Sequence, residues 1–507
     1  GQTWRAEAYG AYARELNRRS NLGRLDTQFL KEALGTVADD PTTSFSAARD
    51  GFFNPYGDGA ANSRAVLDFI GSGYVKTRYE NQVSAFNFKA DGTVLTLPGG
   101  PLKAAFGAQV RRERFQTRNI SLVSRATPTT TIEGPYERTV SAGFLEVRIP
   151  LVGPDNALPG VRRLELSAAG RIERYDDVGT SRNPKLGLIW APADDLTLRA
   201  SYGTSFRAPA LSEVFELQDV GPGILPYGAS QRLVLLRVGG NLNLKPETAR
   251  SWTAGFDYQP AAAPGLKLSG TWFDTRFTGQ IAQPVSDDVF NALTNPIYAS
   301  FIRPVVATNP ADLALVKGLL AQSTSSNAGL FPAEAYTAIV DARYLNTGGL
   351  EVRGVDLTAR WGVDLGADRI DLSANATYLI DYRRQVTPTA PAVELAGTPG
   401  RPARRRAQAQ VGWTHGDVGA SLAVNYLDGA KAASGPSIAS WTTADLQLRW
   451  RPTATSGLQQ DLELAVSVRN LFDTDPPFYD APQGVGFDPA NADPLGRFAS
   501  VQLTKRW

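Results

Sequence analysis

The chain has 507 residues, with 52 Lys and Arg against 50 Asp and Glu, which gives a formal net charge of +2. This balance lacks the concentrated basic excess that nucleic-acid binding requires, so no nucleic-acid partner is expected. Cysteine is absent, which excludes a disulfide framework and a thiolate metal site, and we expect neither a metal nor another cofactor.

A single soluble core rarely grows to this length, whereas a barrel grows by adding strands around one wall. No segment approaches the ~18 consecutive apolar residues of a transmembrane helix, and the other way to cross a bilayer is a closed β-barrel. The chain contains no Met, and it begins at Gly1 inside an alternating pattern without a signal-peptide-like segment. We therefore expect that the natural N-terminus has been removed by processing or truncation.

Period two dominates the hydrophobic pattern, which is typical of β-strands. Near the middle of one segment, for example, Ile370, Leu372 and Ala374 share one face, while Asp371 and Ser373 share the other. The pattern predicts sixteen strands, at residues 3–16, 74–97, 102–117, 137–150, 161–177, 184–192, 195–204, 247–260, 264–278, 340–362, 367–382, 402–414, 418–428, 439–452, 459–470 and 497–507.

Apolar and polar residues alternate alike in soluble sandwiches and membrane barrels, so other features must separate the two. Several predicted strands have about 12 to 16 residues, against ~5–6 in a typical globular sheet. Short turns also alternate with long loops, as in outer-membrane barrels with short periplasmic turns and long extracellular loops. The short turns are Pro98 to Pro101, Ala193-Asp194, Ala261 to Pro264, Gly362 to Gly366 and His415 to Asp417; the long loops are 17–73, 205–246, 279–339, 383–401 and 471–496; the exceptions are 151–160, a longer turn, and 178–183, a short loop on the long-loop side.

Aromatic residues gather near the ends of the predicted strands, where a barrel places its interfacial girdles. They are Trp190, Tyr202, Trp252, Tyr258, Trp361, Tyr382, Trp413, Trp441, Trp450 and Trp507. Two long loops also contain helical patterns. Asp26 is a candidate N-cap for residues 27–34, with Gly35 as the stop, and Asn309 with Pro310 predicts the start of a second helix.

Five segments, taken in order, resemble the signature elements of TonB-dependent outer-membrane receptors. Each falls on the kind of strand or loop that the family has there, and together they extend over essentially the whole chain. They are Ser205-Phe206-Arg207-Ala208-Pro209; the run from Asn241 through Lys245, Pro246 and Glu247 to Thr248; the strand Gly349 to Asp356 with Gly354; Asn470-Leu471-Phe472-Asp473 before Pro476-Pro477; and the last strand from Gly496-Arg497 to Trp507.

The resemblance implies an all-β fold, a transmembrane antiparallel up-and-down β-barrel with long extracellular loops and short periplasmic turns. The family barrel has 22 strands around a plugged lumen, so residues 1–507 would be the barrel domain, with sixteen strands present and the N-terminal plug and about six strands missing. The chain departs from the family's usual ending: Trp507 stands where Phe is usual, and Lys505 stands where an aromatic residue is frequent.

The resemblance further implies a receptor and transporter, not an enzyme. It would sit as a multi-pass protein in the outer membrane of a Gram-negative bacterium, in contact with outer-membrane lipid. The TonB–ExbB–ExbD complex, acting through the missing N-terminal part, would energise uptake of a scarce small-molecule ligand into the periplasm. Siderophore-iron, cobalamin, carbohydrate and other metal chelates all remain open as ligands, and the ligand-binding residues are not identifiable.

Three alternatives remain: a passive porin, a barrel enzyme of the outer membrane, and a soluble β-sandwich enzyme. The single histidine, His415, lies in a predicted periplasmic turn, where a surface role is favoured over catalysis. Arg171 and Arg199 could contact a plug or a polar ligand, but pairing with carboxylates of neighbouring strands is favoured. For Arg207, which the resemblance places near the extracellular rim, a structural role and a ligand contact both remain open. The signature residues are expected to serve either structure or the ligand pathway.

Overall fold

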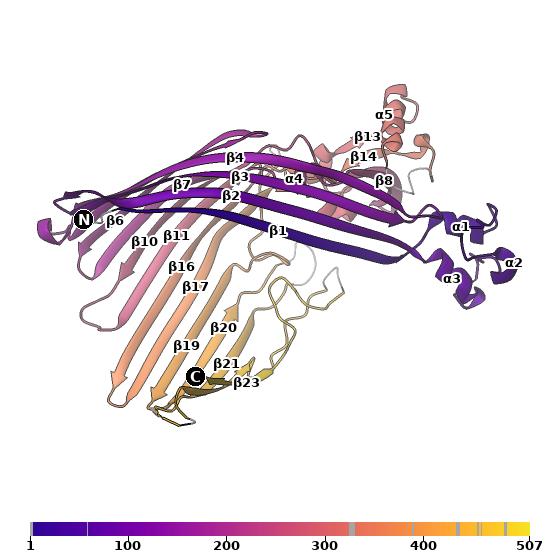
Figure 1. The fold of residues 1–507 in the computed structure, drawn as a ribbon. Helices are drawn as coiled ribbons and strands as arrows, with labels where there is room; N and C mark the ends of the chain where they lie inside the picture. Colours follow the sequence, from indigo (N-terminus) through magenta and orange to yellow (C-terminus); the bar gives the residue numbers. More distant parts are fainter. Residues whose placement is uncertain are drawn as a thin grey trace.

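The computed structural model describes residues 4–57, 59–323, 330–387, 390–431, 437–453, 456–457, 459–480 and 484–506. Seventeen strands form one antiparallel sheet that curves into a wall (Figure 1). Sixteen of them cross the wall in chain order, and the two-residue β18 (Val393–Glu394) adds to the end of one. The sixteen are β1 (Trp4–Arg24), β2 (Gly73–Leu97), β3 (Gly100–Leu122), β4 (Thr129–Val152), β5 (Arg163–Tyr175), β6 (Gly179–Ala193), β7 (Leu196–Arg207), β10 (Glu247–Tyr258), β11 (Leu266–Thr278), β16 (Gly349–Leu365), β17 (Asp368–Gln385), β19 (Arg405–His415), β20 (Val418–Leu427), β21 (Trp441–Trp450), β22 (Leu462–Arg469) and β23 (Phe498–Lys505).

Each of the sixteen predicted strands corresponds to one of these, and the predicted barrel fold is confirmed. Several predicted bounds are wrong. β1 continues eight residues beyond the predicted end at residue 16, and β6 begins at Gly179, which reduces the predicted loop 178–183 to a tight turn. The predicted strand 340–362 begins too early, because β16 starts at Gly349 and residues 340–348 belong to structure outside the wall.

The two faces of the wall follow from the strand register. Phe86 of β2 pairs with Val110 of β3, and both side chains are exposed on the outer, lipid-facing side. Asn87 and Gln109, one residue away on each strand, pair on the opposite side and are joined by a hydrogen bond of 2.5 Å. The predicted alternation therefore separates an apolar outer face from a polar inner face.

The connections are sorted between the two ends of the wall. Figure 1 shows the short turns and both chain termini at one end, and the helices and long loops at the other. In the described residues, β1 pairs only with β2 and β23 pairs only with β22, so each leaves one strand edge free. No helix in the described part of the chain is long and apolar enough to cross a membrane.

The first long loop folds into α1 (Thr27–Ala33), α2 (Ala47–Asp50), a 3-10 turn (Gly59–Ala61) and α3 (Arg64–Ile70). As predicted, Asp26 caps α1: its Oδ1 accepts hydrogen bonds from the backbone N–H groups of Gln28 at 2.8 Å and Phe29 at 3.2 Å. Phe69 stacks between Phe29 and Phe45, with ring centroids 4.3 Å away on each side. These rings give the small helical cluster its own apolar core.

Residues 205–246 and 279–339 were predicted to be long loops, but in the structure they contain most of a compact external module. We use this name for β8 (Asp219–Tyr227), β9 (Ser230–Val238), β13 (Ile302–Pro304), β14 (Ala338–Asp341) and α5 (Pro310–Ala321). The strands form a second sheet in the order β13-β14-β9-β8, in which β14 and β9 are parallel. Buried side chains from its strands, from α5 and from a 3-10 turn pack in two apolar clusters and join segments up to about 100 residues apart; they include Leu225, Val234, Leu235, Tyr298, Val316, Ala338, Ile339 and Val340.

The prediction for α5 is confirmed. Pro310 is its first residue, and the Oδ1 of Asn309 accepts a hydrogen bond from the backbone N–H of Ala311 at 3.0 Å. Short elements complete the loop region: α4 (Leu211–Phe215), the paired strands β12 (Ile281–Ala282) and β15 (Leu345–Asn346), and 3-10 turns at Ser286–Asn291, Pro296–Phe301 and Ala333–Ala335. A further 3-10 turn, Pro154–Asn156, lies at the short-turn end between β4 and β5.

Candidate functional site

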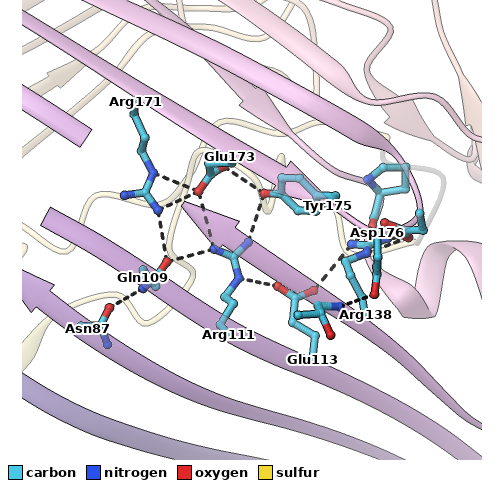
Figure 2. Close-up of polar contacts among 12 residues, drawn as sticks. Asn87, Gln109, Arg111, Glu113, Arg138, Arg171, Glu173, Tyr175 and Asp176 are labelled. Atoms are coloured by element: carbon cyan, nitrogen blue, oxygen red, sulfur yellow. Dashed lines mark hydrogen bonds and ion pairs between the residues drawn. The ribbon is translucent and has the colours of Figure 1, made fainter. Parts of the chain in front are cut away.

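A connected polar network covers the inner face of the wall on β3, β4 and β5. Figure 2 shows Arg111 of β3 between Glu113 of its own strand and Tyr175 of β5. Its Nε lies 2.7 Å from Glu113 Oε1, and its Nη2 donates to the Tyr175 hydroxyl at 3.1 Å. Arg171 of β5 donates to Glu173 at 2.7 Å and to Gln109 at 3.1 Å.

In these contacts, the positive charges of Arg111 and Arg171 are balanced by ion pairs with carboxylates of the same wall. Arg199 of β7 behaves in the same way, with its Nε 3.1 Å from Asp257 Oδ2 of β10. For Arg171 and Arg199 the pairing with neighbouring strand carboxylates, which the sequence favoured, is what the structure shows. Paired charges hold a polar surface rigid without leaving free cations on it.

Arg138 of β4 is the most buried charged residue of the network, with a side chain only 2% exposed. Its Nε donates to Asp177 at 2.7 Å, and its Nη1 donates to the backbone carbonyl of Pro209 at 2.8 Å. Pro209 ends the signature segment that begins at Ser205. This role was not predicted from the sequence, where the available signal was an arginine at an inward position of a predicted strand.

Arg207, the last residue of β7, lies between two glutamates. Glu247, the first residue of β10, is its direct partner in the register, and two hydrogen bonds of 2.6 and 2.8 Å join the side chains. Glu213 of α4 accepts from the other side of the guanidinium at 3.0–3.1 Å. Both carboxylates also hold backbone: Glu213 accepts from the N–H of Ala210 at 2.8 Å, and Glu247 from that of Ile281 at 2.5 Å.

The neighbouring signature residues fix the base of the same loops. Asn241 donates from its backbone to the carbonyl of Glu213 at 3.0 Å and from its side chain to the carbonyl of Tyr344 at 2.9 Å. Lys245, just before Pro246, exchanges two backbone hydrogen bonds of 2.7 Å with the side chain of Asn346. Asn346 was predicted to lie inside the strand 340–362, although the following Gly348-Gly349 pair indicates that the strand starts later.

The segment from Phe206 to Glu216 passes over the network. Phe206 contacts Tyr175, with ring centroids 5.5 Å apart, and Phe215 of α4 stacks on Tyr136 of β4 at 3.9 Å. Glu216 follows α4 and accepts a hydrogen bond from the Tyr79 hydroxyl at 3.4 Å. Burial raises the pKa of the Glu216 carboxyl, and this hydrogen bond opposes the shift only in part.

The Asn470-Leu471-Phe472-Asp473 element forms a tight turn after β22. Asn470 and Asp473 adopt positive φ angles of 49° and 56°, which Asn and Asp tolerate better than most residues. The backbone N–H of Asn470 donates to Asp445 at 2.8 Å, and Asp473 accepts from the N–H of Arg497 at 2.7 Å. The turn therefore ties β21 to the start of the last strand, whereas the Phe472 side chain is 71% exposed.

The other predicted residues have separate positions. Gly354 lies at a bulge between β16 and β17, where a Cβ would stand 2.6 Å from the Phe273 ring. Ser205 pairs with Ala249 in the register of β7 and β10, Ala208 follows β7, and Trp507 lies outside the described residues. His415 is exposed at the short-turn end, with its Nδ1 2.9 Å from Asp368. In the described part of the chain, no group of three His, Cys, Asp or Glu residues is placed to hold a metal ion.

Comparison with known proteins assigns the wall to a family. The family model described as "TonB dependent receptor-like, beta-barrel" matches residues 2–471.

Among solved structures, the RagAB peptide transporter gives a TM-score of 0.56 at 11% identity, over 99% of this chain and 60% of that one. The ferric enterobactin receptor of Pseudomonas aeruginosa gives a TM-score of 0.49 at 17% identity, over 87% of this chain and 64% of that one. The siderophore receptor PirA of Acinetobacter baumannii gives a TM-score of 0.48 at 15% identity, over 87% of this chain and 64% of that one. The chain thus spans less than two thirds of each of these three structures.

Proposed function

The chain belongs to the TonB-dependent receptor β-barrel family. Because members of this family are outer-membrane transporters rather than enzymes, we propose that the chain forms the wall of a receptor. This receptor would take up a scarce small-molecule ligand into the periplasm with energy supplied through TonB. The proposal includes a multi-pass position in the outer membrane of a Gram-negative bacterium, contact with its lipid, and coupling to the TonB–ExbB–ExbD complex. Residues 1–507 act as one barrel domain, and nucleic acid is not a partner.

The sorting of the connections is the observation that carries this proposal. One end of the wall holds mostly short turns, with longer connections at 153–162 and 451–461, while the other holds the first-loop helices and the external module (Figure 1). A receptor needs this arrangement, because recognition happens outside the cell and the periplasmic side needs only closure of the strands. Between the two ends, Arg171 and Arg199 of the inner face pair with carboxylates of the same wall.

We infer that the signature residues brace the loop base and do not themselves contact the ligand. Arg207, Glu213 and Glu247 satisfy one another, and Asn241 and Lys245 hold backbone of the returning segments. Replacing Arg207 by Met should lower the thermal stability of the loop region and leave the ligand affinity of the folded fraction unchanged. Loss of affinity at unchanged stability would refute this role.

Uptake of radiolabelled ligands by cells that express the complete gene product tests the function. The panel contains a ferric siderophore, cobalamin, an oligosaccharide and a peptide, because these represent the ligand classes left open. We expect saturable uptake of one of them, which disappears when the gene for TonB is deleted or the proton gradient is dissipated. Uptake of all four that is non-saturable and independent of the gradient would identify a passive pore instead.

A further inference from the structure

The outer face of β1–β4 changes character along the strands. Towards the short-turn end it is apolar, with Trp4, Phe86 and Val110 exposed. Ten residues separate Trp4 from Arg14 on the same face of β1; at ~3.3 Å a residue and a tilt near 40°, this corresponds to about 25 Å of height. That is the height of the lipid-facing band of a membrane barrel, and Tyr12, which is 63% exposed, marks its upper boundary.

Beyond this boundary the same outer face carries cations. The strand register places Arg14 opposite Gln82, Gln82 opposite Arg114, and, two rungs further out, Arg18 opposite Arg78 and Arg78 opposite Arg118. We call this surface the arginine belt; its members are Arg14, Arg18, Lys76, Arg78, Arg112, Arg114 and Arg118, and the only acidic residues at outward positions of these strands in the same region are Glu80 and Glu137.

The side chains of Arg18, Arg78 and Arg118, which form one rung, repel one another when no anion is bound beside them. Side chains directly opposite on neighbouring strands have Cβ atoms ~4.5–5.5 Å apart, and like charges in such positions repel each other. Arg78 reaches Glu80 at 2.8 Å, but Arg14 shares the same carboxylate at 2.7 Å. Arg18 and Arg118 are exposed and have no carboxylate within ion-pair distance among the described residues.

The opposite part of the wall shows that such crowding is avoidable. On the outer face of β11, β16 and β17 the cations beyond the apolar band each meet acids. Arg276 lies 3.2 Å from Glu351 and 3.3 Å from Asp274, and Arg353 and Arg383 both bind Asp381. Single outward arginines without an ion pair among the described residues also occur at Arg174, Arg182 and Arg250. The rung of three arginines directly opposite one another lies on β1–β3, which with β4 are the longest strands of the wall at 21 to 25 residues.

We propose that the arginine belt binds the phosphate groups of a phosphorylated glycolipid in the outer leaflet of the membrane. Guanidinium groups form paired hydrogen bonds with phosphate oxygens, and a polyanionic headgroup would relieve the repulsion within the rung. A lipid fits better than free phosphate because the belt continues directly from the apolar band, so one molecule can place acyl chains on Phe86 and Val110 and its phosphates on the arginines. The proposal rests on the outer-membrane position proposed above.

The test compares two triple variants of the complete gene product in detergent. The first, Arg18→Gln, Arg78→Gln and Arg118→Gln, removes the crowded rung. The control, Arg19→Gln, Arg360→Gln and Arg406→Gln, removes the same charge from exposed arginines on the inner face, and Arg19 is the immediate neighbour of Arg18. Retained resistance to proteolysis shows that both variants are folded.

Binding of lipid A is measured by native mass spectrometry and by displacement, with dephosphorylated lipid A and inorganic phosphate as the two further probes. We expect the first triple variant to weaken lipid A binding at least tenfold and the control to change it less than twofold. Dephosphorylated lipid A should bind wild type as weakly as lipid A binds the first variant, and millimolar inorganic phosphate should not compete. Equal lipid A affinity in the two variants would overturn the proposal, and full competition by inorganic phosphate would assign a free-anion site instead.

The uptake assay separates this inference from the function on which it rests. Lipid A binding that is lost in the first triple variant, together with gradient-independent uptake, would refute TonB-energised transport but still support lipid binding by the arginine belt. Gradient-dependent uptake, together with lipid A binding that is unchanged in the first triple variant, would support the transport function and refute lipid binding by the arginine belt.

Discussion

The transmembrane wall and the external module bury their apolar side chains in opposite ways. In the wall, each strand sends alternate residues to lipid and to a polar interior, so its apolar side chains stay exposed at the protein surface, as Leu145 and Leu186 do. In the module, Val234 and Val340 have no exposed surface and pack in a core of the module's own. The wall thus depends on its solvent being lipid, while the module behaves as a water-soluble domain would.

The largest expected effect comes from a charge in the module core. Val340→Asp would place a carboxylate without a partner among buried side chains, at a cost of more than about 4 kcal/mol. We expect the module to unfold while the wall stays intact. Limited proteolysis should cleave within residues 219–342 and leave the wall strands protected; simultaneous loss of the wall would show that the two regions fold as one unit.

A charge on the lipid face should have the next largest effect. Ala374 lies midway along the outer face of β17, opposite Ala359, and Ala374→Arg should cost roughly 2–4 kcal/mol near the bilayer midplane. Ser373→Arg, one residue away on the inner face, is the matched control and should be mild. Unfolding by urea in lipid vesicles measures both, and equal costs would contradict the assignment of the faces.

A smaller effect is expected where α5 begins. Asn309→Ala removes the side chain that accepts from the N–H of Ala311, and the loss of such a cap costs about 1 kcal/mol. The melting temperature of the module should fall while that of the wall remains the same. Asn309→Asp keeps the acceptor and should restore the original value; failure of that rescue would mean that the cap does not stabilise the helix.

The smallest effect concerns the exposed ion pair between Lys317 of α5 and Glu334, whose charged atoms are 3.5 Å apart. Both side chains are more than half exposed, so water and salt screen their attraction. Lys317→Ala should leave the module's melting temperature unchanged at physiological salt. A clear decrease would show that surface charge contributes more to the module than its core geometry suggests.

The same comparison explains which parts of the fold were predictable. The sixteen wall strands could be located because lipid on one side and a polar interior on the other impose period two on each strand. The end of β1 was missed because its last residues, such as Arg18, Arg19 and Asn21, are polar on both faces beyond the apolar band. The alternation that reveals a strand disappears where neither face meets the hydrocarbon of the bilayer.

The module was missed for a different physical reason. β9 pairs in parallel with β14, and Val234 meets Ala338 across a separation of about a hundred residues. Such contacts leave no short-range pattern in the sequence. The signature residues were located by resemblance alone, and their partners Arg138 and Asn346 emerged only when distant segments were brought together.

The assignment of the faces is the claim on which the whole account depends, and single cysteines test it directly because the chain has none. Leu372→Cys and Asp371→Cys place thiols on neighbouring positions of β17 with opposite directions. In outer-membrane vesicles we expect a bilayer-restricted maleimide to label position 372 and a water-soluble maleimide to label position 371. The reverse pattern, with the bilayer-restricted reagent on position 371, would contradict the membrane-spanning wall.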